Sequence, residues 1–407
     1  MKLTVIGGGG KISSAAIYEL LNDLPNVPLE IVLYGRNPQK IENTLALSER
    51  FNQGNAQIRA EADLEQALSG ADIVFYCATY GTEDYEGWRS MGIANGAFLL
   101  AIGEKMHTLC PDAWFLVTTN PPDIPLAAIG MRFGLKKLIG LCNAPVFNRK
   151  MLASYLKCEE ASLTMREVGV NHEYWYYDIQ KDGVSIYDEL RKRLPKDYSE
   201  ADIDGPFHRD FPEWKKGFVN NAALVGLTGY LSGPVGGSNR YNGLPLDRKD
   251  MWAVSSRPTA ADFEALMAPG LSKEDIFRTT RRCAAGFPQY IAGILASILT
   301  DDGREHPMLA QNLGAWEQYP ADVFLQMTCA LRRDGLTRPD LSQIPEFIEA
   351  TLASRILQNH LMAQALAQQD DALVQKALLV YPERLACMDA EDFFQTHKSV
   401  EPMIQLD

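Results

Sequence analysis

Four consecutive glycines, Gly7, Gly8, Gly9 and Gly10, stand between a short apolar run and a helical pattern near the start of the chain. The run Lys2 to Ile6 predicts a strand, and Ile12 to Asn22 predicts a helix. Glycines in such a turn let the backbone approach a pyrophosphate, whose charge is met by the N–H groups at the helix N-terminus. The feature therefore predicts a dinucleotide site that includes these glycines and Lys11, with a plain strand-to-helix turn as the alternative.

The first third of the chain alternates short apolar runs with helical patterns, which is typical of parallel βαβ units. Right-handed crossovers would place the strands in one doubly wound parallel sheet. We therefore predict an α/β fold whose N-terminal, Rossmann-type domain covers residues 1–150 and binds NAD or NADP. Besides the first strand and helix, the expected elements are the strands Glu30 to Tyr34, Ala71 to Cys77, Trp114 to Thr118 and Lys137 to Leu141, and helices at Pro38 to Phe51 and through Leu99 to Leu109.

After about residue 150 the pattern changes to antiparallel strands and then to helices. Strands are expected at Ser162 to Val168, Glu173 to Lys181 and Val184 to Tyr187, and most of the chain from Trp214 onward is expected to be helix. Residues 151–407 are thus predicted to form an α+β, mostly helical domain for substrate, metal and subunit contacts. Long apolar faces such as Ala350 to Leu366 indicate a homodimer or homotetramer, or ordinary packing within one chain.

The composition favours a small-molecule ligand over nucleic acid or membrane. The 407 residues include 39 Lys and Arg against 52 Asp and Glu, a net charge of −13, whereas nucleic acid and anionic lipid both require a basic surface. Met1 leads directly into the first strand, and no apolar run approaches the roughly 18 residues of a membrane span. The seven cysteines lack CxxC spacing, so reduced thiols in the cytoplasm are expected.

The second strand ends without the acid that usually hydrogen-bonds the adenosine ribose. It ends Leu33-Tyr34-Gly35-Arg36-Asn37, and an Arg after a small residue is typical of proteins that bind a 2′-phosphate. The cofactor could therefore be NADP(H) as well as NAD(H). Alternatively, Arg36 could stack on the adenine or be a solvated surface charge. Thr79 and Asn120, which follow later strands, complete the expected cofactor contacts.

Three motifs carry a family resemblance. They are Thr119-Asn120-Pro121, Gly140-Leu-Cys142-Asn143-Ala-Pro145 and Gly169-Val-Asn171-His172. With the N-terminal glycines, they resemble glycoside hydrolase family 4, the NAD- and divalent-metal-dependent glycosidases. The resemblance extends to late segments and covers nearly the whole chain, although it is patchy between Gly183 and Gly233. The late segments are Ala310 to Gly314, Tyr319 to Asp322 and Ala377 to Pro382.

The resemblance implies that Cys142 and His172 bind a divalent metal, with Mn²⁺ as the expected ion. A thiolate and an imidazole can hold Mn²⁺, Fe²⁺, Co²⁺ or Ni²⁺ while substrate oxygens complete the shell. Without the resemblance, a buried apolar cysteine and a core histidine would be the simpler interpretation. Family members with Asp after the metal-binding cysteine use that acid to protonate the leaving group, whereas members that cleave β-linkages commonly have Asn there. Asn143 occupies this position, so the resemblance favours a β-linked substrate.

The implied mechanism is an internal redox cycle rather than paired-carboxylate hydrolysis. NAD⁺ takes hydride from sugar C3, the metal polarises the new carbonyl, a base removes the C2 proton, and the aglycone leaves C1 before water adds. The matching base is Tyr241, whose pKa a metal or Arg240 could lower, although a loop tyrosine covering the cleft is the alternative. Asn120, Asn143, Asn171 and Arg240 are the expected sugar contacts.

The phosphate requirement and the reaction class stay open. The segment Ala78 to Arg89 carries three acids and one Arg, which disfavours a sugar phosphate there. A phosphosugar held by Arg240, Arg248 or Arg282 is one alternative, and an unphosphorylated or acidic sugar is the other. A lactate- or malate-type dehydrogenase would share the Rossmann half but leaves Cys142 and His172 unexplained, and a non-catalytic sensor of NAD(P) or sugar is a third class.

Overall fold

The computed structural model describes residues 1–24, 28–54, 56–78, 88–198, 205, 215–233, 272–282 and 286–380. Their strands form one sheet of 13 strands, with the order β10-β8-β7-β12-β11-β6-β5-β4-β1-β2-β3, while β13 and β9 pair with β12 and β8. The last six strands of that order are parallel throughout, which is the arrangement of a Rossmann sheet. They are β1 (Lys2–Ile6), β2 (Leu29–Tyr34), β3 (Ala56–Ala60), β4 (Ile73–Tyr76), β5 (Trp114–Val117) and β6 (Leu138–Gly140).

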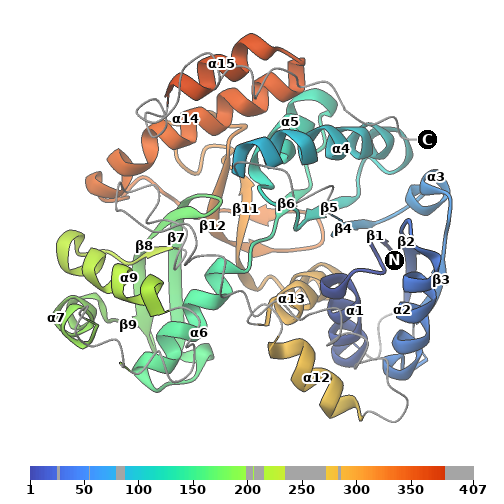
Figure 1. Cartoon of the computed structure of the whole chain (residues 1–407), viewed down its shortest axis with the longest axis horizontal. Coiled ribbons are helices and arrows are strands. Elements are labelled where there is room, and N and C mark those ends of the chain that lie inside the picture. Colours follow the sequence, from blue (N-terminus) through green and yellow to red (C-terminus); the bar gives the residue numbers. More distant parts are fainter. Residues whose placement is uncertain are drawn as a thin grey trace.

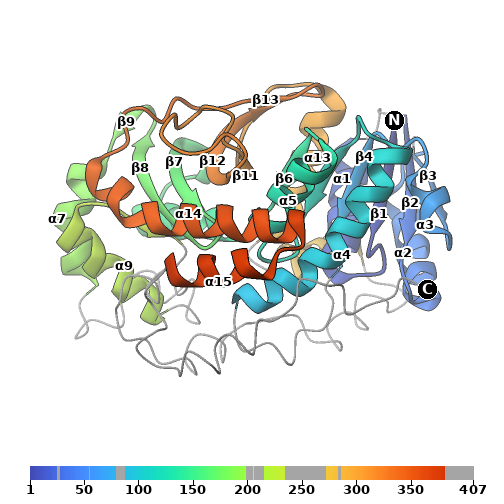
Figure 2. The same cartoon turned by 90° about the horizontal axis from the view of Figure 1, so that it is seen from above.

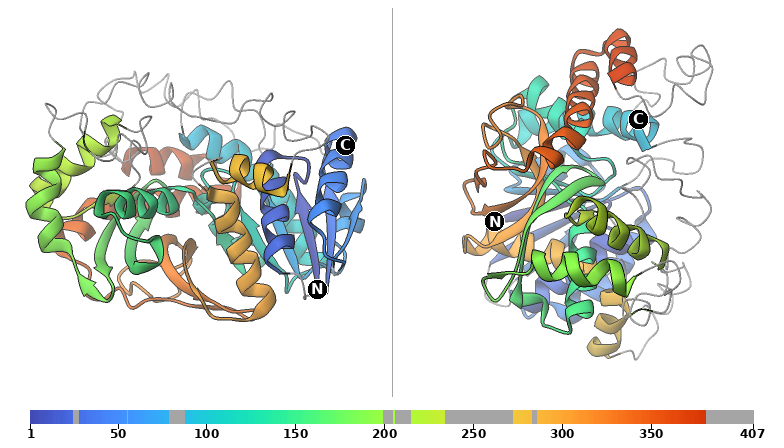
Figure 3. Two further views of the ribbon diagram at one scale, coloured as in Figure 1. Left: turned by 90° about the horizontal axis from the view of Figure 1, so that it is seen from below. Right: turned by 90° about the vertical axis from the view of Figure 1, so that its left-hand side faces the viewer.

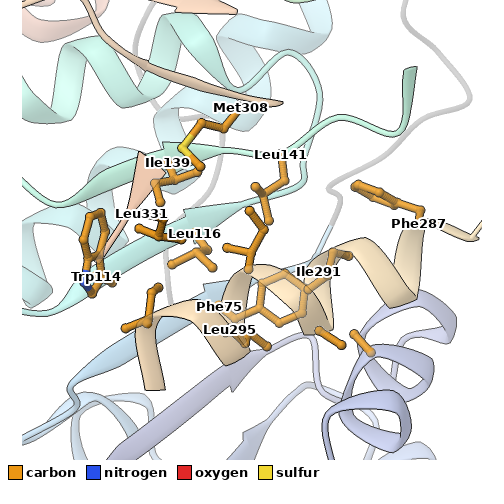
Figure 4. Packing of buried hydrophobic residues seen from close by; sticks show 14 of the residues in the cluster. Phe75, Trp114, Leu116, Ile139, Leu141, Phe287, Ile291, Leu295, Met308 and Leu331 are labelled. Atoms are coloured by element: carbon orange, nitrogen blue, oxygen red, sulfur yellow. The ribbon is translucent and has the colours of Figure 1, made fainter. Parts of the chain in front are cut away.

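Helices cover both faces of the parallel half, because successive strand residues point to opposite sides. Phe75 and Leu116 pack with α1 (Lys11–Asp23) and α13 (Phe287–Thr300) in one core (Figure 4). Val74 and Phe115 pack on the other face, with helices from the first and last thirds of the chain. These are α4 (Trp88–Leu109), α5 (Asp123–Phe133), α14 (Glu346–Gln368) and α15 (Asp371–Val380), while α2 (Pro38–Phe51) follows β2 and α3 (Leu64–Leu68) precedes β4.

The other half of the sheet is antiparallel and contains the hairpin β7 (Leu163–Val170) and β8 (Glu173–Lys181). Strand β12 (Phe324–Leu331) lies between β7 and β11 (Glu305–Gln311), and β11 pairs with β6, so the two halves share one sheet (Figure 1). The remaining elements are α6 (Ala144–Leu156), η1 (Glu160–Ser162), β9 (Val184–Ser185), α7 (Tyr187–Asp197), α9 (Lys215–Thr228), β10 (Ser232–Gly233), α12 (Lys273–Arg282) and β13 (Leu336–Thr337).

Two late helices connect the halves. Figure 2 shows α14 running along the molecule, where it contacts α5 at the Rossmann half and β7 and β8 at the hairpin. Helix α13 lies beside α1, as the left panel of Figure 3 shows. The division of the chain at residue 150 stays a prediction, since sheet and helices pass from one half to the other.

The structure confirms the predicted α/β class and most of the early elements. One expectation was wrong: Val184 to Tyr187 is not a strand throughout, since β9 ends at Ser185 and Tyr187 begins α7. Helices predominate among the described residues after Trp214, but β11 and β12 were not expected there. Seven of the eight β12 residues are buried, so the alternation that marks a half-exposed strand is missing. None of the helices in the described ranges combines the length and apolar character that crossing a bilayer requires.

Candidate active site

The glycine-rich turn after β1 fits a dinucleotide. The N–H groups of Gly7 and Gly8 both donate to Tyr34 O, at 2.9 and 3.0 Å, which draws the ends of β1 and β2 together. Gly7 has φ 86°, and a Cβ there would stand 2.6 Å from Cys77 O, so the turn needs glycine. No side chain caps α1 at Gly10, and Lys11 is its first residue, so the helix N-terminus is available to an anion.

The adenosine end of this turn is basic. Arg36 and Lys40 are exposed just beyond β2, while Asn37 caps α2 by accepting from Lys40 N at 3.1 Å. Glu61, at the end of the neighbouring β3, already accepts hydrogen bonds from Arg59 and from the backbone N–H groups of the two residues after it. Arg36 thus stands where the ribose-binding acid of a NAD protein would be.

Cys142 and the Asn171–His172 turn meet beyond the carboxyl ends of the central strands. Cys142 follows β6, is 4% exposed and precedes Asn143, the residue before α6. Asn171 and His172 form the two-residue turn between β7 and β8, with His172 at φ 61°. A left-handed conformation at a non-glycine residue is uncommon, and such residues cluster at functional sites.

Gly169 allows this turn to close. A Cβ on Gly169 would lie 2.3 Å from Glu173 O and 2.5 Å from the Tyr174 Cα, both of them backbone atoms. Any larger residue would therefore separate the two strands at the end of the hairpin. The glycine of the Gly169-Val-Asn-His172 motif is explained by this close approach.

Burial shifts the pKa values of the two proposed ligands in opposite directions: it favours the neutral imidazole that binds a metal, and it favours a thiol that must lose its proton to do so. The Asn171 carboxamide lies beside the Cys142 thiol, and burial raises the pKa of that thiol to about 11, with the Asp123 carboxylate acting in the same direction. A thiol of this kind ionises when a cation binds it. Burial lowers the pKa of His172 to about 4, so the imidazole is neutral at pH 7, as a metal ligand must be.

The described residues offer two protein ligands rather than a closed cage. They contain no group of three or more His, Cys, Asp or Glu side chains arranged to hold a metal ion. Neither polar atom of the buried Asn171 side chain completes a hydrogen bond with another described residue. A cation between Cys142 and His172 would therefore need oxygens from substrate or water, with Asn171 available to either.

Asn120 lies at the same edge of the sheet, between β5 and α5. Its backbone oxygen accepts from Asn95 Nδ2 at 3.1 Å, and the peptide bond to Pro121 is cis. Its side-chain Oδ1 is buried and finds no partner in the described part of the chain. Asn120 thus fits either the cofactor or the sugar, as predicted.

Three buried charged residues were missed by the sequence analysis. Asp123, at the start of α5, accepts from Asn171 N at 3.1 Å, and Glu173 pairs with Arg355 of α14 at 2.5 Å. Two signals in the sequence could have indicated them: Glu173 is an acid at the start of an aromatic strand, and Arg355 lies in the apolar face of a helix. The pairing itself joins residues 182 positions apart, which no local pattern reveals.

Thr79, Arg240 and Tyr241 lie outside the described residues, and so does Arg248. The structure brings together the predicted residues Cys142, Asn143, Asn171 and His172. Asn120 follows β5, which pairs with β6, whereas the glycine turn follows β1, two strands beyond β5 in the sheet. The base and the phosphate contacts stay predictions.

Comparison with known proteins decides the family. Residues 167–383, more than half of the chain, match the model of the family 4 glycosyl hydrolase C-terminal domain, and residues 86–158 match that of family 4 glycosyl hydrolase. The chain belongs to glycosyl hydrolase family 4. Among its family 4 relatives, an α-galactosidase of Bacillus subtilis (strain 168) is 23% identical over 439 residues, which cover 96% of this chain and 95% of the relative.

Solved structures confirm the fold. A 6-phospho-α-glucosidase from gut microorganisms, in complex with NAD and glucose-6-phosphate, has a TM-score of 0.79 at 17% identity and covers 100% of both chains. The Thermotoga maritima 6-phospho-β-glucosidase with manganese, NAD⁺ and glucose-6-phosphate has a TM-score of 0.74 at 18% identity over 97% of each chain. A lactate dehydrogenase from Eimeria maxima scores 0.59 at 16% identity over 90% of this chain and 96% of its own. The family 4 fold therefore includes the predicted dehydrogenase-like half.

Proposed function

We propose that this family 4 protein is a glycosidase that cleaves a sugar glycoside with the help of NAD and a divalent cation, Mn²⁺ being the preferred ion. The observation that carries the proposal is the meeting of the buried Cys142 with the Asn171–His172 turn, on a sheet whose other half carries the glycine turn. The family membership supports the same reaction class, since relatives are named as glucosidases and galactosidases.

Each group has a distinct task in this proposal. The glycine turn and the α1 N-terminus hold the pyrophosphate of the cofactor. Cys142 and His172 hold the cation, which when bound supplies Lewis-acid polarisation of a substrate oxygen. Asn120, Asn143 and Asn171 orient sugar hydroxyls by hydrogen bonds, and Tyr241 serves as the base, with Arg240 beside it. Burial of Cys142 and Asn171 keeps water from competing for the ligands.

The substrate class is a glycoside whose sugar is either a 6-phosphosugar or an unphosphorylated or otherwise acidic sugar. Glucose-6-phosphate occupies solved relatives, which supports a phosphosugar, whereas the acid-rich segment after β4 supports the unphosphorylated alternative. We further propose a cytoplasmic homodimer or homotetramer. The five cysteines in the described ranges are free thiols, and Phe347, Leu357 and Leu379 expose apolar surface on α14 and α15.

A panel of aryl α- and β-glycosides, each with and without 6-phosphate, tests the function. Release of the chromophore should require NAD⁺, Mn²⁺ and a reductant together, and chelation with EDTA should abolish it. Stoichiometric NADH must not accumulate, because the hydride returns to the sugar. Accumulation of NADH with a free sugar would favour a dehydrogenase, and binding without turnover would favour a sensor.

Arg36→Gln tests the cofactor preference. The variant is expected to bind NADP⁺ about 10-fold more weakly while its NAD⁺ affinity stays within about twofold, because a charged hydrogen bond to phosphate contributes roughly 1.5 kcal/mol. Titration of protein fluorescence with each dinucleotide gives both dissociation constants. Equal losses for NAD⁺ and NADP⁺ would instead mean that Arg36 stacks on the shared adenine.

A further inference from the structure

Two sets of hydrogen bonds flank the Asn171–His172 turn, and both lead to one face of α14. Before the turn's histidine, Asp123 Oδ2 accepts from Asn171 N at 3.1 Å and from Asn359 Nδ2 at 2.8 Å. After it, Glu173 Oε2 accepts from Arg355 Nε at 2.5 Å. Positions 355 and 359 are one helical turn apart, so their side chains share a face of the helix.

Both sets of hydrogen bonds involve buried side chains. The side chains of Glu173 and Arg355 are 7% and 5% exposed. Arg355 Nη1 also donates to Gln358 Oε1 at 2.7 Å, and Gln358 Nε2 donates to Ala377 O of α15 at 2.9 Å. Asp123 is 3% exposed and accepts a third hydrogen bond, from its neighbour Ile124 N, at 3.1 Å. Helix α14 is thereby held both to α15 and to the residues that flank the turn.

Stability alone is a poor reason for this arrangement. A buried ion pair loses so much hydration that two well-packed apolar side chains of similar volume are often as stable or more stable. What the charged groups add is direction, because each hydrogen bond fixes a donor and an acceptor in space. The turn that they fix carries His172 in a left-handed conformation, which needs support from its surroundings.

We propose that Asp123, Glu173, Arg355 and Asn359 are positioning residues that hold the Asn171–His172 turn in its ligand-binding conformation. Asp123 holds the backbone of Asn171, and Arg355 holds the side chain of Glu173, so both neighbours of His172 are fixed. None of the four ligates the cation in this assignment. The inference rests on the proposed function, in which His172 is a metal ligand, and it makes α14 the support of a site to which it contributes no ligand.

The test compares single and paired replacements in the full-length chain. Glu173→Gln and Asn359→Ala should each raise the Mn²⁺ dissociation constant, measured by isothermal titration calorimetry, about 10- to 100-fold, as for other residues that orient a metal ligand. The double variant Glu173→Leu with Arg355→Met removes both charges together. It should unfold within a few degrees of the unmodified chain without metal, yet still bind Mn²⁺ at least about 10-fold more weakly.

The control and the contrary outcomes separate this inference from the proposed function. Arg304→Gln breaks an ion pair of the same 2.5 Å length at the surface, between Arg304 and Asp302, and should leave the Mn²⁺ dissociation constant unchanged. A stable double variant that binds Mn²⁺ as tightly as the unmodified chain would overturn the positioning role alone. An unmodified chain that binds no Mn²⁺ would overturn the proposed function and this inference with it.

Discussion

Cys142→Ser and His172→Ala are each expected to lower kcat/KM for the best glycoside of the panel by about 1000-fold, because in the proposed site they are the two protein ligands of the cation. Polarisation by a metal ion contributes several kcal/mol to a transition state, and about 4 kcal/mol corresponds to this factor. The serine hydroxyl is close in size to the thiol but is a far weaker ligand for a soft divalent ion. Steady-state kinetics at saturating NAD⁺ and Mn²⁺ measure the effect.

Cys158→Ser is the matched control. Cys158 is a free, partly exposed cysteine in the connection after α6, and its replacement should leave kcat/KM within about twofold. Thermal unfolding of each variant without metal shows whether the fold survives. A folded Cys142→Ser protein that keeps more than a tenth of the activity would contradict the assignment of Cys142 as a ligand.

Glu167→Gln is expected to change how stability depends on pH. Glu167 lies on β7 and is 1% exposed, and it accepts hydrogen bonds from Gln326 Nε2 at 3.2 Å and Thr328 Oγ1 at 3.1 Å, both on β12. Burial raises the pKa of its carboxyl to about 7, although these two hydrogen bonds and the charge of Arg149 oppose the shift. The folded protein therefore binds this proton more tightly than the unfolded chain does.

The direction of the effect follows from linkage. The neutral carboxyl stabilises the folded state fully below pH 4.5, and that contribution is lost as pH rises through about 7. Glutamine does not titrate, so the free energy of unfolding of Glu167→Gln minus that of the unmodified chain should grow by about 3 kcal/mol between pH 4.5 and pH 8. Urea unfolding at several pH values measures it. Glu305→Gln, at an exposed position, is the control, and parallel curves for Glu167→Gln would disprove the shift.

The sequence predicted the Rossmann half well because its signals are local. Helix α2 of this half occupies Pro38–Phe51, as expected, since a proline marks its start. The same holds for β8 in the antiparallel half, which occupies Glu173–Lys181 and is marked by a run of aromatic residues. Strands β11 and β12 were not predicted, because both of their faces are covered and their Ala, Met, Leu and Gln residues are also common in helices. Burial decided between the two, and burial is a property of the whole fold.

The residues of the candidate site also differ in whether a local sequence pattern could reveal them. Cys142 and His172 were predicted because the short motifs around them resemble those of the family, and their role as metal ligands stays a prediction. Asp123, Glu173 and Arg355 act through contacts between distant segments, so they became visible only when α14 was placed against the hairpin. Thr79, Arg240 and Tyr241 stay predictions from sequence.

The pairing of β6 with β11 at Gly140 and Leu309 has a mechanical consequence. Proteins that close around a ligand by rotating two bodies need a hinge of a few residues between them. Here the dinucleotide half and the hairpin half belong to one sheet, and a rotation between them would have to break the pairing of Gly140 with Leu309 and separate α14 from α5 or from the hairpin. The proposed cofactor and cation sites thus lie on one continuous sheet, and this continuity opposes a change in the distance between them.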